Sequence, residues 1–272
     1  MVAPSNPAAA GSVTPGSLAG RRAVVTGGGS GIGRAIAIHL ARAGADVAVV
    51  GRRAEPLAET CDLIGAAAPE RKAIAASADL REPEQTDRVI DEVLEAFGGV
   101  DILVNNAGGQ FVSPAEQIPY KGFRAVTRLN LDAPWYLTTQ LAARSMIPAG
   151  YGKVISITMT PRRGMPGMSH SSAARAGMES LTRTWAVEWG RYGVRTVAIA
   201  PGIVHTDAWE RYGLNPDDIA TVVPLGRLEA ADEVAAMATF LAGPGGDYVT
   251  GATIVVDGGL DVSGMGSAFG KS

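Results

Sequence analysis

Short apolar runs alternate with amphipathic stretches along most of the chain. The runs hold small and β-branched residues with few polar residues among them, which is typical of strands buried on both faces of a sheet. The stretches between them repeat apolar residues at helical spacing, as at Val89, Ile90, Val93 and Phe97. The pattern predicts strands over 23–25, 45–50, 73–78, 101–106, 153–158, 195–200 and 252–256, and helices over 34–40, 56–67, 83–97, 123–146, 171–189 and 230–241.

This alternation of strands and helices predicts an α/β fold. Right-handed crossovers between parallel strands place helices on both faces, so we expect a Rossmann-type, doubly wound parallel sheet. No polar linker, composition shift or internal repeat divides the chain. We therefore expect a single domain over 19–262, preceded by a flexible N-terminal arm over 1–18 and followed by a tail over 263–272.

The composition suits a globular protein and argues against some classes of partner. Of the 272 residues, 46% are hydrophobic and 19% are charged, which is enough apolar material for a sizeable core. The net charge of −3 gives no support for binding to nucleic acid or to an anionic membrane surface, and no apolar run is long enough to cross a membrane. The single cysteine, Cys61, excludes an internal disulfide and fits a reducing compartment. With no secretory signal at the N-terminus, we expect a cytoplasmic protein.

A glycine-rich stretch, Thr26–Gly33, lies between the first predicted strand and the first predicted helix. Glycines let the backbone turn sharply and approach a ligand closely, and the following helix directs unpaired N–H groups toward a phosphate. This order of strand, glycine turn and helix favours a dinucleotide site over a plain surface loop. The expected contacts are Gly27, Ser30, Gly31, Ile32 and Gly33.

The end of the second predicted strand indicates which dinucleotide binds. An acidic residue there accepts from the ribose 2′-OH of NAD, whereas an arginine accommodates the 2′-phosphate of NADP. This chain has Arg52 and Arg53 at that place, with no carboxylate before Glu55. NADPH is therefore favoured over NAD, the alternative being a solvated basic turn. Asp79, at the end of the third strand, is expected to bond the adenine, cap the next helix, or do both.

Four separated motifs resemble those of the short-chain dehydrogenase/reductase family. They are Thr26–Gly33, Asn105-Asn-Ala-Gly108, Asn130 within Leu-Asn-Leu, and Pro201-Gly202 followed by Thr206, and the match runs from about Leu18 to Gly259. The resemblance implies a Rossmann-type fold, a nicotinamide cofactor and a homo-oligomer, usually a tetramer or dimer. It also implies cofactor contacts at Leu80, Asn106, Ala107, Gly108, Arg175, Pro201, Gly202, Ile203 and Thr206.

The chain departs from the family at its catalytic Tyr-x-x-x-Lys signature. Ser171 stands at the tyrosine and Arg175 at the lysine, and the family's upstream serine corresponds to Thr158 or Thr160, with Met159 between them. A serine hydroxyl is far less acidic than a phenol, so ordinary ketone reduction is disfavoured. The trans-2-enoyl-CoA and 2,4-dienoyl-CoA reductases also lack this tyrosine, and residues 104–116 and 170–177 resemble the former. The last residues, Phe269–Ser272, carry no peroxisomal ending of the Ser-Lys-Leu type, which suggests a bacterial-type cytosolic relative.

This resemblance implies NADPH-dependent reduction of the C=C bond of an enoyl thioester, carried by coenzyme A or a carrier protein, as in fatty acid metabolism. Such a reaction needs hydrogen-bond donors aimed at a developing enolate, and Ser171 and Thr158 are candidates. Arg175 would hold the ribose and stabilise charge, while Asn130 would anchor a water chain near it. Phe111, His170 and Trp209 are candidates at the substrate, with a surface or packed position as the alternative for His170. Arg162 and Arg163 are candidates for the coenzyme A phosphates, with surface solvation as the alternative, and no metal is expected.

Less specific explanations stay open at this point. Ser171 is a possible helix N-cap, and Arg175 a possible ion-pair partner of Glu179. The whole protein is alternatively a carbonyl or alcohol oxidoreductase with a replaced tyrosine, or a catalytically silent NADP-binding protein.

Overall fold

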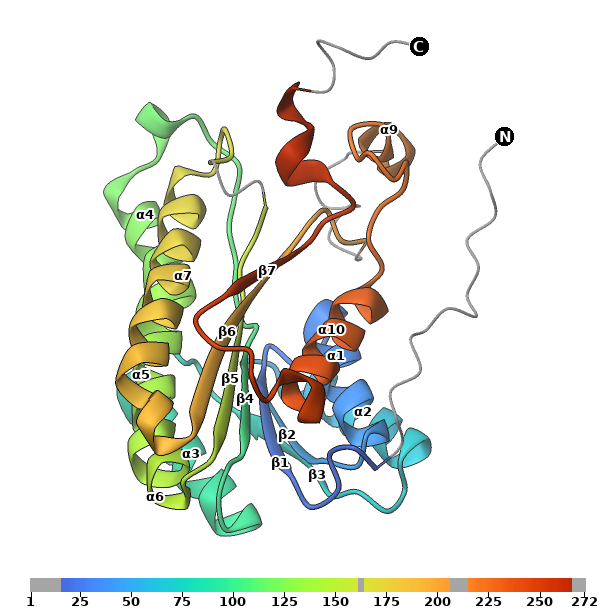
Figure 1. Cartoon of the computed structure of the whole chain (residues 1–272). Helices are drawn as coiled ribbons and strands as arrows, with labels where there is room; N and C mark the ends of the chain where they lie inside the picture. The colour runs from blue at the N-terminus through green and yellow to red at the C-terminus, as the bar shows by residue number, and fades with distance from the viewer. Residues whose placement is uncertain (1–15, 161–163, 206–214, 266–272) are drawn as a thin grey trace.

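Seven parallel strands form one sheet in the order β3–β2–β1–β4–β5–β6–β7 (Figure 1). The computed structural model describes residues 16–160, 164–205 and 215–265. The predicted Rossmann-type fold is confirmed, and each predicted strand is present within two residues of its expected bounds. The strands are β1 (Arg22–Thr26), β2 (Asp46–Gly51), β3 (Ala73–Ser77), β4 (Ile102–Asn105), β5 (Gly152–Ile157), β6 (Val194–Pro201) and β7 (Thr253–Val256).

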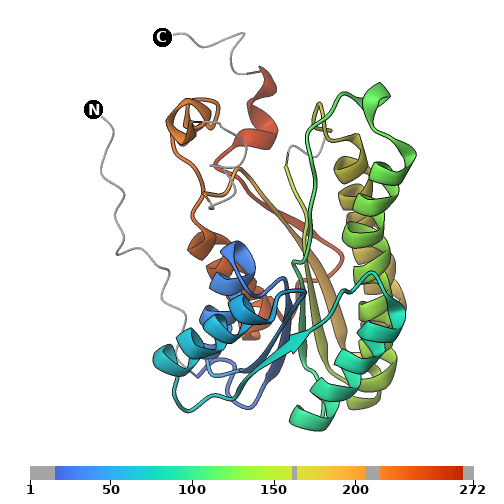
Figure 2. The same ribbon diagram turned by 180° about the vertical axis from the view of Figure 1, so that it is seen from behind.

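Helices cover both faces of the sheet (Figures 1 and 2). One layer holds α1 (Gly31–Arg42), α2 (Ala54–Ala67) and α10 (Ala231–Ala242), and the other holds α3 (Pro83–Phe97), α4 (Tyr120–Thr127), α5 (Ala133–Leu141), α6 (Ile147–Ala149) and α7 (Ser169–Trp189). The short helix α9 (Pro216–Ala220) lies at the end of the molecule toward which the strands run and was not predicted. Each of the other helices overlaps a predicted one except α6, which begins directly after the end of the helix predicted over 123–146.

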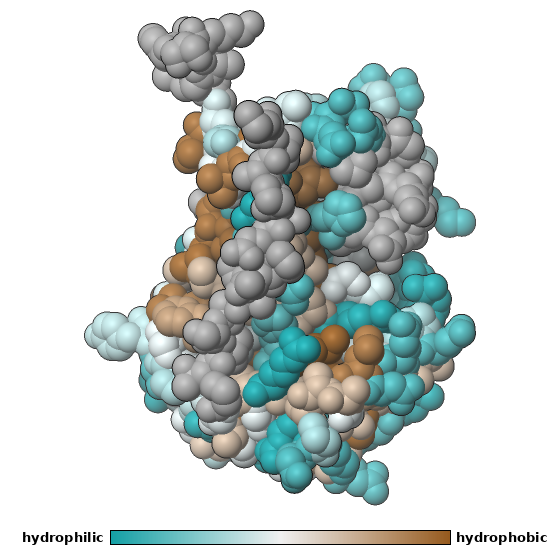
Figure 3. Space-filling model, turned by 90° about the vertical axis from the view of Figure 1, so that its right-hand side faces the viewer, coloured by the Kyte–Doolittle hydropathy of each residue, from teal (hydrophilic) through white to brown (hydrophobic). Residues whose placement is uncertain are grey.

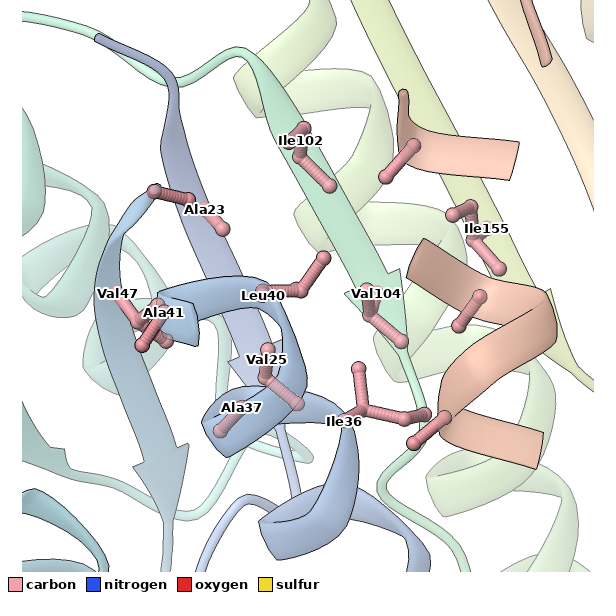
Figure 4. Packing of buried hydrophobic residues seen from close by; sticks show 14 of the residues in the cluster. Ala23, Val25, Ile36, Ala37, Leu40, Ala41, Val47, Ile102, Val104 and Ile155 are labelled. Atoms are coloured by element: carbon pink, nitrogen blue, oxygen red, sulfur yellow. The ribbon is translucent and has the colours of Figure 1, made fainter. Parts of the chain in front are cut away.

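The apolar residues that define the pattern in the sequence form the core between sheet and helices. Val25 and Val104, on adjacent central strands, contact the α1 side chains Ile36 and Leu40, all nearly inaccessible to solvent (Figure 4). Full burial of each such side chain contributes about 1.5–3 kcal/mol. This packing fixes α1, and therefore the glycine turn before it, on the central strands.

The order of the strands reverses next to β1. β1 pairs in parallel with β2 on one side and with β4 on the other, and the connections that follow β1 and β4 lead to opposite layers. In doubly wound sheets, ligands bind outside the carboxyl ends of the strands at such a switch point. The predicted site residues that the structure describes follow strand ends on this side or lie between α4 and α7 beside it.

The single helix predicted over 123–146 is continuous from Tyr120 to Ala149 but is interrupted by two π-helical segments, Arg128–Asp132 and Ala142–Met146. A π segment inserts one extra residue into a turn and re-aims the side chains around it, often at a functional site. The first segment contains Asn130 at its centre.

The outer surface of the α1–α2–α10 layer is mixed. Polar side chains (teal) surround patches of apolar ones (brown) on this side of the molecule (Figure 3). Within the described ranges, no helix is both long enough and apolar enough to cross a membrane.

Candidate active site

The glycine turn after β1 is closely packed against its surroundings. Gly27 has a φ of 66°, in the left-handed region that glycine adopts without strain. At Gly33, an added Cβ would lie 2.3 Å from the carbonyl oxygen of Gly27, so only glycine allows the first helical turn this close to the strand end. Ser30, the exposed N-cap residue of α1, makes no capping hydrogen bond with its side chain. The free hydroxyl and the N–H groups of Gly31–Gly33 fit the pyrophosphate of a dinucleotide.

The segment after β4 is bonded to this turn. The backbone N–H groups of Asn106 and Ala107 both donate to Thr26 Oγ1, at a distance of 3.0 Å in each case. The Asn106 side chain adds a third hydrogen bond between the two segments: its Nδ2 donates to the carbonyl oxygen of Thr26 at 2.9 Å. The two loops at the switch point therefore form one rigid unit.

A cleft extends from the glycine turn across the ends of β2 and β3. Arg52 and Arg53 are exposed on its rim, and no ion pair among the described residues holds either guanidinium. A planar guanidinium bonds a phosphate in two places at once, so this rim fits a 2′-phosphate. The cleft is lined by Gly27, Gly29, Ser30, Gly51, Arg52, Arg53, Pro56, Leu57, Ala78, Asp79, Leu80, Ala107, Gly108 and Leu129.

Asp79 is ionised at neutral pH. Hydrogen bonds from Arg81 lower the pKa of its carboxyl group to about 2, and the charge of Arg52 adds to this effect. The alternative assignment of Asp79 as a helix cap is wrong, because the N-cap of α3 is Glu82. The ionised carboxylate of Asp79 lines the cleft, where it is a charged hydrogen-bond acceptor.

Asn130 is fully buried and reaches back to the loop after β4. Its Oδ1 accepts from the N–H of Gly109 at 3.0 Å, and its Nδ2 donates to the carbonyl oxygen of the same residue at 3.1 Å. The π segment aims the side chain at this loop. Asn130 thus fixes Gly108 and Gly109 in place; its predicted role in a water chain stays a prediction.

Arg175 lies one helical turn after Ser171 on the inner face of α7. Its Nη1 donates to the carbonyl oxygen of Ile157 at 2.6 Å. Burial lowers the pKa of Arg175 to about 10, so the guanidinium stays protonated at neutral pH. Gly108 leaves room for it, since an added Cβ there would lie 2.3 Å from Arg175 Nη2. The ion pair with Glu179 is not formed: among the described contacts of this guanidinium there is no carboxylate.

Ser171 donates from Oγ to Gln110 Oε1 at 2.8 Å, and the sulfur of Met159 is 3.7 Å from the same hydroxyl. The alternative assignment of Ser171 as a helix N-cap is wrong, because α7 begins at Ser169 and its N-cap is Met168. Gln110 was not predicted. Its position in the sequence, two residues after Gly108 on a loop already assigned to the site, is the signal that was available.

The two threonines that were candidates for the family's serine face away from Ser171. Thr158 Oγ1 donates to the carbonyl oxygen of Ile199 at 3.1 Å, and Thr160 Oγ1 donates to that of Pro201 at 3.2 Å. Strand alternation therefore turns Met159, between them, toward Ser171. For Thr158 to donate to a substrate, as predicted, it must give up its bond to β6.

His170 and Phe111 contact each other at the same end of α7. Their ring centroids are 4.4 Å apart at an interplanar angle of 80°. The N–H of Ser171 donates to His170 Nδ1 at 2.7 Å, and burial lowers the pKa of the imidazole. The ring is therefore neutral at pH 7. Phe111 is half-buried, so its exposed part suits the predicted wall of a substrate pocket, whereas the fully buried His170 packs behind it.

The segment after β6 is held by a residue that was not predicted. The N–H of Gly202 donates to Glu229 Oε2 at 2.9 Å, and the N–H of Glu229 donates to the carbonyl oxygen of Ile203 at 3.0 Å. No sequence pattern marks Glu229. Four residues assigned to the site, Arg162, Arg163, Thr206 and Trp209, lie outside the described residues.

No described tyrosine takes the place of the missing phenol. Tyr136 bonds Asp87, Tyr151 packs under Arg21 at the opposite ends of the strands, and Tyr120, Tyr192 and Tyr248 are exposed. The sixth, Tyr212, is outside the described ranges.

Comparison with known proteins gives consistent similarities over nearly the whole chain. The model of the family described as enoyl-(acyl carrier protein) reductase matches residues 27–261. A probable 2,4-dienoyl-CoA reductase of Bacillus subtilis, which produces (2E)-enoyl-CoA, is 40% identical over 243 residues, covering 87% of this chain and 94% of the relative.

Solved structures give the same result. A citronellol catabolism dehydrogenase of Pseudomonas aeruginosa is 40% identical with a TM-score of 0.81, covering 91% of this chain and 97% of its own. A short chain dehydrogenase of Burkholderia cenocepacia, solved in complex with NADP, is 33% identical with a TM-score of 0.84, covering 90% of this chain and 100% of its own.

Proposed function

The chain belongs to the short-chain dehydrogenase/reductase family of oxidoreductases, which bind a nicotinamide cofactor, and we propose that it reduces the C=C bond of an enoyl thioester with NADPH. The observation that carries this proposal is the pair Ser171–Gln110 at the place where the family has its tyrosine. Neither group has the acidity of a phenol, so the pair suits hydrogen bonding to an oxygen better than proton transfer to an alkoxide.

Reduction of a conjugated C=C bond needs such donors. A hydride, which the bound nicotinamide supplies, adds to Cβ, and negative charge develops on the thioester oxygen. A proton then adds to Cα, so that one C=C bond becomes a CH–CH bond and NADPH becomes NADP⁺. Donors fixed in advance around that oxygen stabilise the charge without reorganisation during the reaction.

The side chains of this site would provide those donors. Ser171 directs its hydrogen to Gln110 Oε1, which leaves the two N–H groups of the exposed Gln110 amide for the substrate oxygen. Arg175 is protonated and is held in place by its hydrogen bond to the Ile157 carbonyl oxygen, so it adds a fixed positive charge beside Gly108. Asn130 holds the backbone of Gly108 and Gly109 in place, and this fixes the loop that carries Gln110 and borders Arg175.

NADPH is preferred over NADH in this proposal because of the two unpaired guanidinium groups, Arg52 and Arg53, on the cleft rim. The acyl chain would lie against the exposed part of the Phe111 ring, which is supported from behind by the buried ring of His170. We also propose that the carrier is coenzyme A or a carrier protein, in fatty acid metabolism, and that the protein works as a homo-oligomer in the cytoplasm.

The test is a substrate panel followed through NADPH absorbance. It contains crotonyl-CoA, a longer trans-2-enoyl-CoA and a 2,4-dienoyl-CoA, beside a β-ketoacyl thioester and a terpenoid alcohol with NADP⁺. The proposal expects turnover of an unsaturated thioester, with kcat lowered about tenfold or more in Gln110→Ala. Ser171→Ala is expected to lower kcat less, because it only frees the amide to rotate.

A second candidate, a carbonyl or alcohol oxidoreductase, is favoured by the similarity to the citronellol catabolism dehydrogenase. Turnover of only the ketone or the alcohol would support it and overturn C=C reduction. Tight binding of NADPH with no turnover on the whole panel would instead support a silent dinucleotide-binding protein.

A further inference from the structure

A buried carboxyl group ties the segment after β6 to the loop before α10. Three hydrogen bonds join Glu229 to this segment. The N–H of Gly202 is shared between Oε2 and the Val256 carbonyl oxygen of β7, at 2.9 Å from each. The N–H of Glu229 donates to the Ile203 carbonyl oxygen at 3.0 Å, and the N–H of His205 donates to the Glu229 carbonyl oxygen at 2.7 Å. Two are made by the backbone and would survive a change of side chain. The first depends on the carboxyl group.

The surroundings of this carboxyl group do not favour its charge. Glu229 is 8% exposed, and its Oε1 has no hydrogen-bond partner among the residues that the structure describes. It lines a small cavity with apolar side chains such as Val223 and Leu225. An ionised carboxylate left partly unsolvated in this way is costly, and proteins keep one only where it is compensated or used.

The charged groups around Glu229 do not balance the negative charge of its carboxylate. Arg227 is paired with Glu233 of α10, through two bonds of 2.7 Å. Asp257, at the end of β7, is a second acid, already occupied by the N–H groups of Gly259 and Asp261. Burial raises the pKa of Glu229 to about 7; the N–H of Gly202 and the charge of Arg227 oppose this rise, and the charges of Glu233 and Asp257 add to it. His205 is exposed on the segment itself.

We infer that Glu229 is a positioning residue whose ionised carboxylate holds Pro201–Ile203 in the shape that binds the cofactor, so that cofactor affinity follows its protonation state. The inference rests on the proposed function, in which this segment contacts the bound cofactor. A charged acceptor bonds an N–H group about twice as strongly as a neutral one. Affinity should accordingly be higher above pH 7, where Glu229 is ionised, by about fivefold.

The same group should act in the opposite direction on stability. A folded-state pKa raised above the unfolded value means that the stability conferred by the proton is present at low pH and is lost as pH rises through about 7. Replacing Glu229 by the isosteric, uncharged glutamine removes that loss. A residue with only a structural role would not show higher stability together with weaker binding.

The experiment compares Glu229→Gln with the wild type and with Glu95→Gln, the same chemical change at an exposed position of α3. Kd for NADPH and for NADH is measured by cofactor fluorescence at about pH 6 and about pH 8, with a thermal melt at each pH. We expect the ratio of variant to wild-type Kd to be about five at pH 8 and about one at pH 6. We also expect Glu229→Gln to melt about 3 °C or more above wild type at pH 8, and Glu95→Gln to match wild type throughout.

A Kd ratio that is equal at both pH values overturns the inference, as does failure of the wild type to bind either dinucleotide. A lower melting temperature for Glu229→Gln at pH 8 also overturns it, because the carboxylate would then be simply stabilising. The 2′-phosphate of NADPH titrates equally in both proteins and cancels in the ratio. Because only binding is measured, a flat ratio beside active enoyl reduction refutes the inference alone, and a pH-dependent ratio without enoyl reduction refutes the proposed function alone.

Discussion

Gly108 offers the sharpest test of where Arg175 acts. A Cβ added at this position would lie 2.3 Å from Arg175 Nη2 and 3.2 Å from Asn130 Oδ1. Its backbone does not require glycine, since Gly108 is not among the residues with positive φ. Gly108→Ala should therefore fold normally and displace the guanidinium, because the end of a long side chain yields more easily than the loop backbone.

The size of the effect follows from the bond that is lost. Ordinary contact between a carbon and a nitrogen atom requires about 3.5 Å, so the guanidinium must move by about 1 Å or more. This movement breaks the 2.6 Å bond from Arg175 Nη1 to the Ile157 carbonyl oxygen. A hydrogen bond from a charged donor is worth about 1.5–3 kcal/mol, which corresponds to a decrease in kcat of about 10- to 150-fold.

The assay is steady-state kinetics with the best enoyl thioester, beside thermal unfolding. We expect the decrease in kcat, little change in KM for the thioester, and a melting temperature lowered by about 3–12 °C, because the lost bond also stabilises the fold. Gly109→Ala is the matched control, because its added Cβ would lie 3.4 Å from Leu129 Cδ2, an ordinary contact. Retention of kcat/KM within about twofold by Gly108→Ala, or an equal loss in both variants, would refute the role given to Arg175.

Other residues give independent predictions. Replacing Arg52 and Arg53 together by alanine should raise KM for NADPH about tenfold or more and leave KM for NADH nearly unchanged. Steady-state titration of both cofactors measures the two values. Equal changes in KM for both cofactors would contradict the assignment of these arginines to the 2′-phosphate. Asp101→Asn should lower the unfolding free energy by about 3 kcal/mol, because the buried carboxylate accepts three hydrogen bonds from Arg22. Asp132→Asn, in an exposed ion pair with Arg124, should lower it by less than about 0.5 kcal/mol, and urea unfolding of both variants measures the difference.

Most of the fold could be predicted from the sequence, because the pattern is strong where burial is complete. β2 is apolar throughout after Asp46, and α3 agrees with its predicted bounds at both ends. The π segment around Asn130 was not predictable, because an extra residue in a helical turn leaves no mark on hydrophobic spacing when the helix continues on both sides.

The candidate site was predictable where a residue type has one plain use. The glycines of the turn are required by a positive φ or by close contacts, and a motif records both. Gln110 and Glu229 were missed because their importance lies in what they contact: one faces Ser171, which is 61 positions away, and the other meets Gly202 across two loops. Such pairings depend on tertiary structure and leave no local pattern.

The central claim, hydride addition to a C=C bond, is tested most directly by following the label from deuterated NADPH into the product. The enzyme is incubated with a trans-2-enoyl-CoA and NADPH carrying deuterium at the transferred position, and the product is examined by NMR. We predict one deuterium at C3 of a saturated acyl thioester, with the hydrogen at C2 coming from solvent. Deuterium on a carbinol carbon from a ketone substrate, with no label entering any unsaturated thioester, would contradict it.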